Sequence, residues 1–369
     1  MKLIVQIPCF NEERTLPQTV ADIPRHIEGV DTVEILVIDD GSTDGTVAVA
    51  RELGVDHIVR HRRNRGLAAT FRTGIDAALH LGADIIVNTD GDNQYPGGEI
   101  PRLIAPILAR QASIVVGDRQ TQTIAHFSPT KKLLQKVGSS FVSRISGLDI
   151  PDVVSGFRAY SRDAALALNV VSAFSYTVET IIQAGNHKEA ITHVPIETNA
   201  VTRPSRLFKS MGNFLTRQVT TIIRMYALYR PLRTFAMIGG ILLILGLLPM
   251  VRFLILFAMG EGAGHLQSLV LGGVLVVLGV NTLILGLLAD LLGWSRVLQE
   301  TTLEKIRRVE LAVDVMSKED SRRTNDSRAT GHPPGRRHPH RQRVRQVPEP
   351  EPHRPGADGQ FPERVPPVL

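Results

Sequence analysis

The chain has few cysteines and lacks the glycine-rich motifs and the signal peptide that mark several common protein classes. It has one cysteine, Cys9, in 369 residues, which excludes an internal disulfide framework and suits a reducing cytosol. It has no G-x-G-x-x-G and no G-x-x-x-x-G-K-[ST] pattern, so it carries neither a dinucleotide fingerprint nor a P-loop. The N-terminal stretch MKLIVQIP is too short an apolar run for a signal peptide. A disulfide-stapled secreted scaffold and two glycine-rich nucleotide sites are therefore excluded.

The sequence also lacks a basic helix with interleaved aromatic residues, which is the pattern expected of a nucleic-acid groove. The formal net charge is +6, but much of the basic excess lies beside two apolar segments and in the C-terminal tail. An anionic lipid surface explains this distribution better than a nucleic acid does. We therefore expect a membrane bilayer as a partner and no nucleic acid.

Two long apolar segments, at about 234–259 and 266–288, each reach the roughly 20 residues needed to span a bilayer core. They predict a transmembrane hairpin within residues 231–295. The joining loop GEGAGH has no Lys or Arg, whereas basic residues flank the hairpin on both sides. The positive-inside rule then places the N-terminal domain and both termini in the cytosol, on an integral protein of a plasma membrane or an ER-type membrane. Arg252 interrupts the first segment, either with an intramembrane partner or as a side chain that snorkels to the far interface.

The sequence on either side of the hairpin is polar or mixed. Residues 205–230 mix apolar and basic residues and predict an amphipathic helix that lies at the cytosolic leaflet. Residues 296–316 predict a cytosolic helix. Residues 317–369 are rich in Pro, Arg, His and charge, and predict a disordered basic tail.

The first 204 residues alternate apolar runs with segments of helical length and spacing, which is the pattern of a mostly parallel sheet covered by helices on both faces. The expected strands are 3–7, 34–38, 57–59, 84–87 and 113–116, and the expected helices are 15–27, 43–53, 66–81 and 99–109. Ser42 or Thr43 can cap the second helix. In such α/β sheets ligands bind beyond the carboxyl ends of the strands.

Acidic motifs stand where three of these strands are expected to end: IPCFNEE at 7–13, IDDGSTDGT at 38–46 and NTDGDNQYP at 88–96. Asp90 and Asp92 in the third motif can point at one site if a cation sits between them, and a hard divalent cation fits that position. The alternative is an Asp-rich turn without a ligand, because Asp and Asn bond their own backbone.

These motifs, followed by VVGDR at 115–119 and SGFRAY at 155–160, resemble family two glycosyltransferases with the GT-A fold. The similar branch is that of the polyprenyl- and dolichol-phosphate sugar synthases, many of which carry a comparable two-helix membrane anchor. The resemblance covers about residues 1–230. It implies a Rossmann-like cytosolic GT-A domain over residues 1–204, a nucleotide-sugar donor and a polyprenyl or dolichyl phosphate acceptor. A homo-oligomer is left open.

The resemblance also implies the roles of individual residues. Donor-binding roles fall on Pro8, Phe10, Glu12, Ile38, Asp39, Asp40, Asp90, Gly91, Asp92, Gln94, Arg203, Arg206 and Lys209. Metal-binding roles fall on Asp90, Asp92 and Gln94, whose oxygen donors favour Mg²⁺ or Mn²⁺. Acceptor-phosphate roles fall on Arg119, Lys131, Lys132 and Ser139, and the catalytic roles fall on Asp92 and Arg119. Local alternatives are that one of Asp39 and Asp40 caps the following helix, and that Lys131, Lys132 and Ser139 occupy an exposed helix face.

The sequence departs from the family pattern at two single positions and in the local sequence of the basic cluster from Arg203 to Lys209. Phe10 replaces a frequent Tyr, which keeps the ring packing and loses a hydroxyl contact. Some bacterial relatives carry an Asp with a catalytic role directly before the Phe-Arg pair, and here that position is Gly156. Asp152 lies nearby in the sequence and is an alternative candidate for that role, although the sequence does not support base catalysis by this loop.

The expected reaction is an inverting transfer of a hexose from a nucleotide-sugar of the GDP-mannose or UDP-glucose type to the lipid phosphate at the cytosolic face. Such an acceptor needs no base, because the second pKa of a phosphate is about 6 and its oxygen is already anionic at neutral pH. One alternative is transfer to a hydroxyl acceptor, as in polysaccharide synthases, but the only tryptophan, Trp294, stands in LLGWSR and excludes their Q-x-x-R-W motif. The other alternative is a non-catalytic membrane scaffold.

Overall fold

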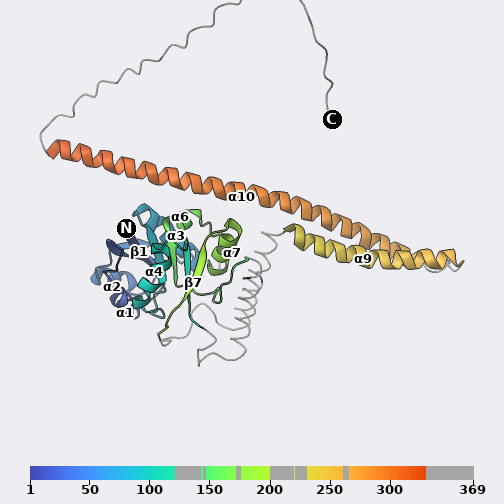
Figure 1. Ribbon diagram of the computed structural model, residues 1–369, viewed down its shortest axis with the longest axis horizontal. Helices are drawn as coiled ribbons and strands as arrows, with labels where there is room; N and C mark the ends of the chain where they lie inside the picture. The colour runs from blue at the N-terminus through green and yellow to red at the C-terminus, as the bar shows by residue number, and fades with distance from the viewer. Residues whose placement is uncertain are drawn as a thin grey trace, which may run out of the picture. The chain divides into compact units, whose positions relative to one another are not determined.

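The computed structural model describes residues 1–120, 143, 147–171, 176–199, 220, 231–260 and 266–329 (Figure 1). The chain divides into two compact units, Met1–Met316 and Ser317–Leu369. The sheet and the site described below belong to the first unit. The expected amphipathic helix at 205–230 falls outside the described residues except at position 220.

Among the described residues, strands form a 7-stranded sheet in the order β3-β2-β1-β4-β6-β5-β7. Its strands are β1 (Lys2–Cys9), β2 (Thr32–Asp39), β3 (His57–Arg60), β4 (Ile85–Asn88), β5 (Ile114–Asp118), β6 (Arg158–Ser161) and β7 (Ile191–Pro195). β1 pairs in parallel with β2 on one side and with β4 on the other. The strand order therefore reverses beside β1, and the carboxyl ends of β1, β2 and β4 open onto one edge at this switch point. The expected α/β sheet is confirmed.

The sequence pattern does not predict β6 or β7. β6 runs antiparallel between β4 and β5, and β7 runs parallel to β5 at the end of the sheet. β6 begins with Arg158, a residue type that sequence patterns assign to solvent, although here its side chain is fully buried. β7 reads ITHVP and is only half-buried, so it lacks the continuous apolar run that marks the five expected strands.

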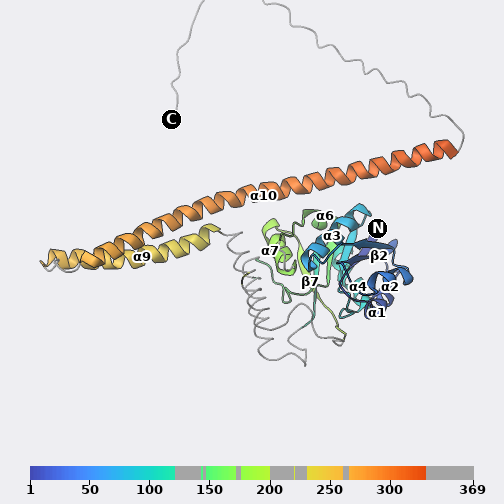
Figure 2. The same cartoon turned by 180° about the vertical axis from the view of Figure 1, so that it is seen from behind.

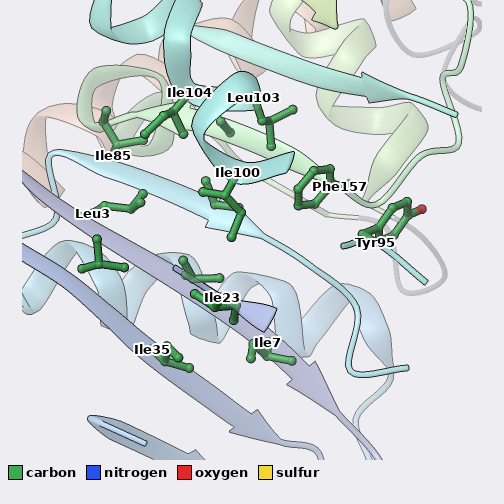
Figure 3. Packing of buried hydrophobic residues seen from close by; sticks show 14 of the residues in the cluster. Leu3, Ile7, Ile23, Ile35, Ile85, Tyr95, Ile100, Leu103, Ile104 and Phe157 are labelled. Atoms are coloured by element: carbon green, nitrogen blue, oxygen red, sulfur yellow. The ribbon is translucent and has the colours of Figure 1, made fainter. Parts of the chain in front are cut away.

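The helices that cover the sheet are α1 (Leu16–Asp22), α2 (Thr46–Glu52), α3 (Leu67–His80), η1 (Gly97–Glu99), α4 (Ile100–Leu108), α6 (Arg162–Ala167) and α7 (Thr177–His187) (Figures 1 and 2). Side chains of β1 point alternately to the two faces. Leu3 and Ile7 join a core with α1 and α4, whereas Ile4 joins a core with α3 and α6. Figure 3 shows the first core, with Ile100 and Leu103 of α4 packed on the strands. Burial on both faces explains the near-continuous apolar runs in the sequence.

The second helix begins later than expected, and neither Ser42 nor Thr43 caps it. α2 starts at Thr46 with Gly45 at the N-cap position, and the Thr46 backbone N donates to Asp44 Oδ1 at 3.0 Å. Ser42 Oγ instead accepts a hydrogen bond from the Asn11 backbone N at 2.9 Å. The Ser42 hydroxyl thus ties the second acidic motif to the first.

Two further helices, α9 (Pro231–Ala258) and α10 (Leu266–Ala329), are long and apolar enough to cross a membrane. Their most apolar windows have mean hydropathy values of 2.6 and 2.4, and only 6% and 17% of these windows are buried. Helices in the core of a soluble domain would be mostly buried, so both helices fit a membrane environment better. α10 continues through the expected cytosolic helix at 296–316 and past the expected start of the tail at 317.

Glycines set the close approach of α9 and α10. A Cβ atom at Gly239 would lie 2.9 Å from the carbonyl oxygen of Gly279, and one at Gly246 would lie 2.9 Å from the carbonyl oxygen of Gly272. Small residues allow such backbone contact between membrane helices. Arg252 is exposed on α9.

Candidate active site

The three acidic motifs meet at the carboxyl edge of the sheet. Thr15 Oγ1, just after the first motif, donates to the carbonyl oxygen of Gly91 at 2.7 Å. A Cβ atom at Gly91 would lie 3.2 Å from Cys9 Sγ and 3.3 Å from Glu12 Cγ, so a larger residue here would require these two side chains to shift by a few tenths of an ångström. The structure therefore brings the first and third motifs into direct contact.

The loop after β4 separates its side chains into two sets. Gly91, Asn93 and Tyr95 are buried, whereas Asp90, Asp92 and Gln94 alternate with them and are half-buried. Asn93 has a φ of 54°, a left-handed conformation that Asn tolerates, and its Nδ2 donates to Asp22 Oδ2 at 2.9 Å. The alternation leaves the three oxygen-bearing side chains expected at a metal on the more open side of the loop.

These three side chains fit a hard divalent cation by their chemistry. Two carboxylates and one amide supply oxygen donors only, which suits Mg²⁺ or Mn²⁺ and does not suit Zn²⁺. No group of three His, Cys, Asp or Glu able to hold a metal occurs in the described part of the chain. A metal at this loop would accordingly take the Gln94 amide or the ligand's own oxygens besides Asp90 and Asp92.

Asp90 lies against Gly156, which precedes β6. A Cβ atom at Gly156 would lie 3.2 Å from both carboxylate oxygens of Asp90 and 3.1 Å from the Tyr176 hydroxyl. The Gly156 backbone N donates to the Tyr95 hydroxyl at 3.3 Å, and the Tyr95 ring stacks on Phe157 with 5.2 Å between centroids (Figure 3). Burial raises the pKa of Tyr95 to about 12, so its hydroxyl stays protonated.

We expect Gly156→Ala to weaken metal binding by about three- to tenfold, because the added methyl group presses on the Asp90 carboxylate and shifts a ligand by a few tenths of an ångström. The measurement is the Mn²⁺ concentration that gives half-maximal activity. Gly98→Ala is the matched control, since a Cβ there meets nothing within 4 Å. An unchanged Mn²⁺ requirement in Gly156→Ala would contradict the assigned position of Asp90.

The residues expected to border a nucleoside are placed unevenly. Phe10 is 38% exposed at the end of β1, Pro8 is half-buried, and Glu12 is buried, with its Oε2 accepting from Thr15 Oγ1 at 2.9 Å. Ile38 is fully buried in the core beside α3. Its side chain therefore packs inside the domain, and only its backbone lies near the edge of the sheet.

Asp39 and Asp40 are both buried and bind the loop that follows β3. Asp39 accepts from the Ser42 backbone N and from Arg60 Nε, each at 3.1 Å. Asp40 accepts from the backbone N atoms of Arg65 and Gly66 at 2.8 and 2.9 Å. Neither residue caps α2, whose N-cap is Gly45. Both carboxylates instead hold residues 60–66 beside the edge of the sheet.

His61 is a site residue that the sequence reading misses. Its ring lies between Asp40 Oδ1, 2.8 Å from Nδ1, and Thr73 Oγ1 of α3, 3.0 Å from Nε2. The signal in the sequence is the basic stretch RHRRNRG at 60–66, which lies directly before α3. His61 therefore connects the second motif to a helix on the other side of the loop.

Arg119 forms a bidentate ion pair with Asp152 at the end of β5. Its Nε and Nη2 atoms lie 2.7 and 3.0 Å from the two carboxylate oxygens. Burial alone would lower the pKa of Arg119, but the charge and hydrogen bonds of the Asp152 carboxylate raise it, so the guanidinium stays charged. Asp152 is fully buried, and both of its carboxylate oxygens accept hydrogen bonds from Arg119. This ion pair removes Asp152 as a candidate base.

Arg158 of β6 organises the backbone beneath the site. Its guanidinium donates to the carbonyl oxygens of Ser155 and Val153, both at 2.8 Å, and to Thr177 O and Thr180 Oγ1 of α7 at 2.8 and 2.7 Å. It therefore ties the loop that carries Gly156 to the first turn of α7. Arg158 thus supports the backbone of the SGFRAY segment from below.

The chain after β7 also reaches the site. The Asn199 backbone N donates to the Gln94 carbonyl oxygen at 3.0 Å, and Asn199 Nδ2 donates to Asn93 O at 2.9 Å. Six expected site residues lie outside the described part of the chain: Lys131, Lys132, Ser139, Arg203, Arg206 and Lys209.

The comparisons with known proteins agree on one family. The sequence matches the family described as Glycosyl transferase family 2 over residues 4–168. It is 32% identical over 202 residues to an uncharacterized protein of Methanocaldococcus jannaschii, which covers 53% of this chain and 81% of that protein. It is 29% identical over 206 residues to polyprenol monophosphomannose synthase of Mycolicibacterium smegmatis, which covers 53% of this chain and 76% of that enzyme.

Another relative is a UDP-N-acetylglucosamine–dolichyl-phosphate N-acetylglucosaminyltransferase of Methanococcus voltae, 29% identical over 214 residues, 52% of this chain and 83% of that enzyme. Among solved structures, glucosyl-3-phosphoglycerate synthase from Mycobacterium tuberculosis in complex with phosphoglyceric acid is similar with a TM-score of 0.50. Its sequence is 20% identical, and the match covers 61% of this chain and 79% of that one. This likeness concerns the fold.

Proposed function

The chain belongs to glycosyl transferase family 2, and from this we propose that it transfers a hexose from a nucleotide-sugar to a polyprenyl or dolichyl phosphate. Two of the relatives support the acceptor class, because one is named a polyprenol monophosphomannose synthase and the other a transferase to dolichyl phosphate. The observation that carries the proposal is the oxygen-donor loop of Asp90, Asp92 and Gln94 at the edge of the sheet, in a chain with two membrane-length helices. The donor is of the GDP-mannose or UDP-glucose type.

The loop after β4 holds the diphosphate end of the donor in this proposal. Asp90, Asp92 and Gln94 would hold Mg²⁺ or Mn²⁺. A metal held there would neutralise the charge that develops on the departing nucleotide diphosphate. Phe10, Glu12 and the loop held by Asp39 and Asp40 border the nucleoside.

The transfer is an in-line displacement that inverts the anomeric carbon. A lipid-phosphate oxygen forms the new bond to this carbon while the bond to the nucleotide diphosphate breaks, and the leaving oxygen keeps the electron pair. The phosphate oxygen is already anionic at neutral pH, which agrees with the absence of a free carboxylate at Asp152. The chain's task is to hold two anions together in the correct orientation.

Arg119 is the described cation best placed for the acceptor phosphate. A guanidinium has five N–H donors in a planar fork, and two of the nitrogen atoms of Arg119 face Asp152. The remaining donors can bind a phosphate oxygen. Asp152 would then fix the direction of the fork and keep Arg119 in place when the acceptor leaves.

We expect the double variant Arg119→Ala/Asp152→Asn to raise the KM for lipid phosphate by about ten- to hundredfold, since a charge-assisted contact contributes about 1.5–3 kcal/mol. Donor affinity should change less than twofold. The double variant is used because Arg119→Ala alone leaves the Asp152 carboxylate buried and unpaired. Asp152→Asn alone is the control, and an unchanged acceptor KM in the double variant would reject the role of Arg119.

The two apolar helices anchor the enzyme, and we place the catalytic domain and both termini in the cytosol. Arg233 precedes the first span, Arg296 follows the second, and the loop between the spans has no Lys or Arg. The reaction then takes place at the cytosolic face, where nucleotide-sugars are found.

A radiolabel-transfer assay tests the function directly. Full-length protein in detergent receives Mg²⁺ or Mn²⁺ and a panel of GDP- and UDP-sugars, with and without polyprenyl phosphate. Label that enters the organic phase only with lipid phosphate and metal supports the proposal and names the donor. Donor cleavage without a lipid product would indicate a hydroxyl acceptor, and no donor turnover would indicate a non-catalytic scaffold.

A further inference from the structure

The second apolar helix does not end at the membrane. α10 runs as one helix from Leu266 to Ala329, and its apolar part is expected to end near Leu288. The following residues, 296–314, contact the catalytic domain on the face opposite α1 and α4. This segment is called the α10 strut below.

Polar contacts fasten the strut to α3 and α6. Arg307 Nη1 donates to the carbonyl oxygens of Leu168 and Leu166, at 2.7 and 3.3 Å, where α6 ends. Arg307 Nη2 lies 3.4 Å from Asp76 Oδ1 of α3. A cation is favourable at the carboxyl end of a helix, because the last carbonyl groups of α6 have no partner within the helix. One side chain thus binds two elements of the catalytic domain.

A second set of contacts lies about two helical turns nearer the membrane. Glu300 is 5% exposed, and its carboxylate lies 3.3 Å from His187 Nε2 at the end of α7 and 2.8 Å from Arg296 Nε. Arg308 adds a contact of 2.9 Å to Asp163 of α6. The strut therefore meets three different helices of the domain along its length.

An apolar side chain of the strut is part of the domain core. Leu311 is 7% exposed and belongs to the core cluster that contains Phe71 and Ile75 of α3. Val309 and Val313, on either side of it in the sequence, are 63% and 51% exposed. Three of the residues that contact the domain, Glu300, Arg307 and Leu311, recur at helical spacing and form one face of α10.

We propose that the α10 strut sets the height and orientation of the catalytic domain above the bilayer, so that the lipid-phosphate headgroup reaches the carboxyl edge of the sheet. This role rests on the proposed function. A helix rises 1.5 Å per residue, so Leu311 lies about 35 Å along α10 from the end of the apolar stretch at Leu288. A docked helix fixes that distance, whereas a flexible linker would let the domain sample many orientations and lose the benefit of a positioned acceptor.

The His187 contact makes docking sensitive to pH. The hydrogen bond to Glu300 raises the pKa of His187, and burial opposes it. Because the folded pKa is raised, this contribution to docking is complete below the unfolded pKa of His187 and is lost as the pH rises through the folded pKa. The charged groups that face the pair are Glu189 beside α7, and Arg296 and Glu304 on α10.

The first measurement is a distance between two spin labels in the full-length protein in lipid nanodiscs. Thiol labels on Thr302→Cys of α10 and Glu52→Cys of α2 report the position of the strut, and the only native cysteine, Cys9, is buried. We expect a single narrow distance distribution. A broad distribution in the wild-type background would overturn the proposal, because the strut would then not be docked.

The second measurement compares an undocked variant with a matched control in vesicles of phosphatidylcholine and phosphatidylglycerol. Arg307→Ala/Leu311→Asp changes two side chains that contact the domain, and Lys305→Ala/Val313→Asp makes the same types of change at exposed positions of the same helix. In the undocked variant we expect a broader label distance and an at least tenfold loss of kcat/KM for membrane-bound polyprenyl phosphate. Transfer to a water-soluble short-chain prenyl phosphate should stay within twofold, and the control should stay within twofold with both acceptors.

The two acceptors separate positioning from a merely structural role. Equal losses of kcat/KM with the lipid and the soluble acceptor would contradict the positioning role of the strut, because they would mean that Arg307 and Leu311 only support folding. Full lipid activity in a variant whose labels show undocking would contradict it as well. A wild-type protein that uses neither acceptor would instead contradict the proposed function.

Discussion

Replacement of Asp92 by alanine is expected to lower sugar transfer by about two to three orders of magnitude, the usual cost of removing one group that stabilises developing charge. Asp92 is half-buried in the loop after β4, and one of its oxygens accepts from the Gln94 backbone N at 3.2 Å. The fold should survive, because this side chain lies on the open side of the loop and not in the core. The measurements are initial rate against Mn²⁺ concentration and melting temperature.

Asp22→Ala is the matched control for Asp92. Asp22 is exposed and binds the same loop from outside, through Asn93 Nδ2 at 2.9 Å. It should lower stability slightly and leave the Mn²⁺ dependence unchanged. Wild-type rates in Asp92→Ala, with a normal melting temperature, would remove Asp92 from the metal site and would favour the ligand-free turn.

Replacement of Arg158 by alanine is expected to destabilise the catalytic domain by about 3–5 kcal/mol, the range for breaking a buried charged network. Arg158 is fully buried and donates to four acceptors in the loop before β6 and in α7. Its loss removes a charged donor from each of these acceptors and creates a cavity beside Tyr176, whose ring centroid lies 6.0 Å from the guanidinium carbon. Chemical denaturation of the full-length protein in detergent measures the change.

Arg162→Ala provides the comparison, because Arg162 lies just after the same strand and donates to a single carbonyl oxygen, Ala83 O, at 3.0 Å. We expect a cost of about 1 kcal/mol there. Similar costs for Arg158→Ala and Arg162→Ala would show that the buried network does not hold β6 in place.

The sequence predicts the parts of the fold that follow from local patterns. β1, β2 and β4 are buried on both faces, so their apolar runs are continuous and easy to identify. The two apolar helices are equally plain from length alone. The positions of the acidic motifs at strand ends follow from the same pattern, since parallel strands share a carboxyl edge.

What the sequence does not predict depends on contacts between distant residues. Arg119 and Asp152 are 33 positions apart, and their pairing changes Asp152 from a candidate base into an ion-pair partner. His187 and Glu300 are 113 positions apart, so the docking of α10 leaves no local pattern. The local sequence around Asp39 and Asp40 is equally compatible with capping of the next helix. Only the three-dimensional structure shows that these carboxylates bind residues 60–66 instead.

The backbone contact between α9 and α10 also determines which sequence changes this protein can tolerate during evolution. Positions such as Gly240 and Gly273 have nothing within 4 Å of an added Cβ atom, so we expect them to vary freely among apolar residues. At Gly239 and Gly246 any other residue adds at least a methyl group, and a carbonyl oxygen of the other helix already lies beside that position. Within one membrane hairpin, neutral drift and strong purifying selection should therefore act on neighbouring glycines.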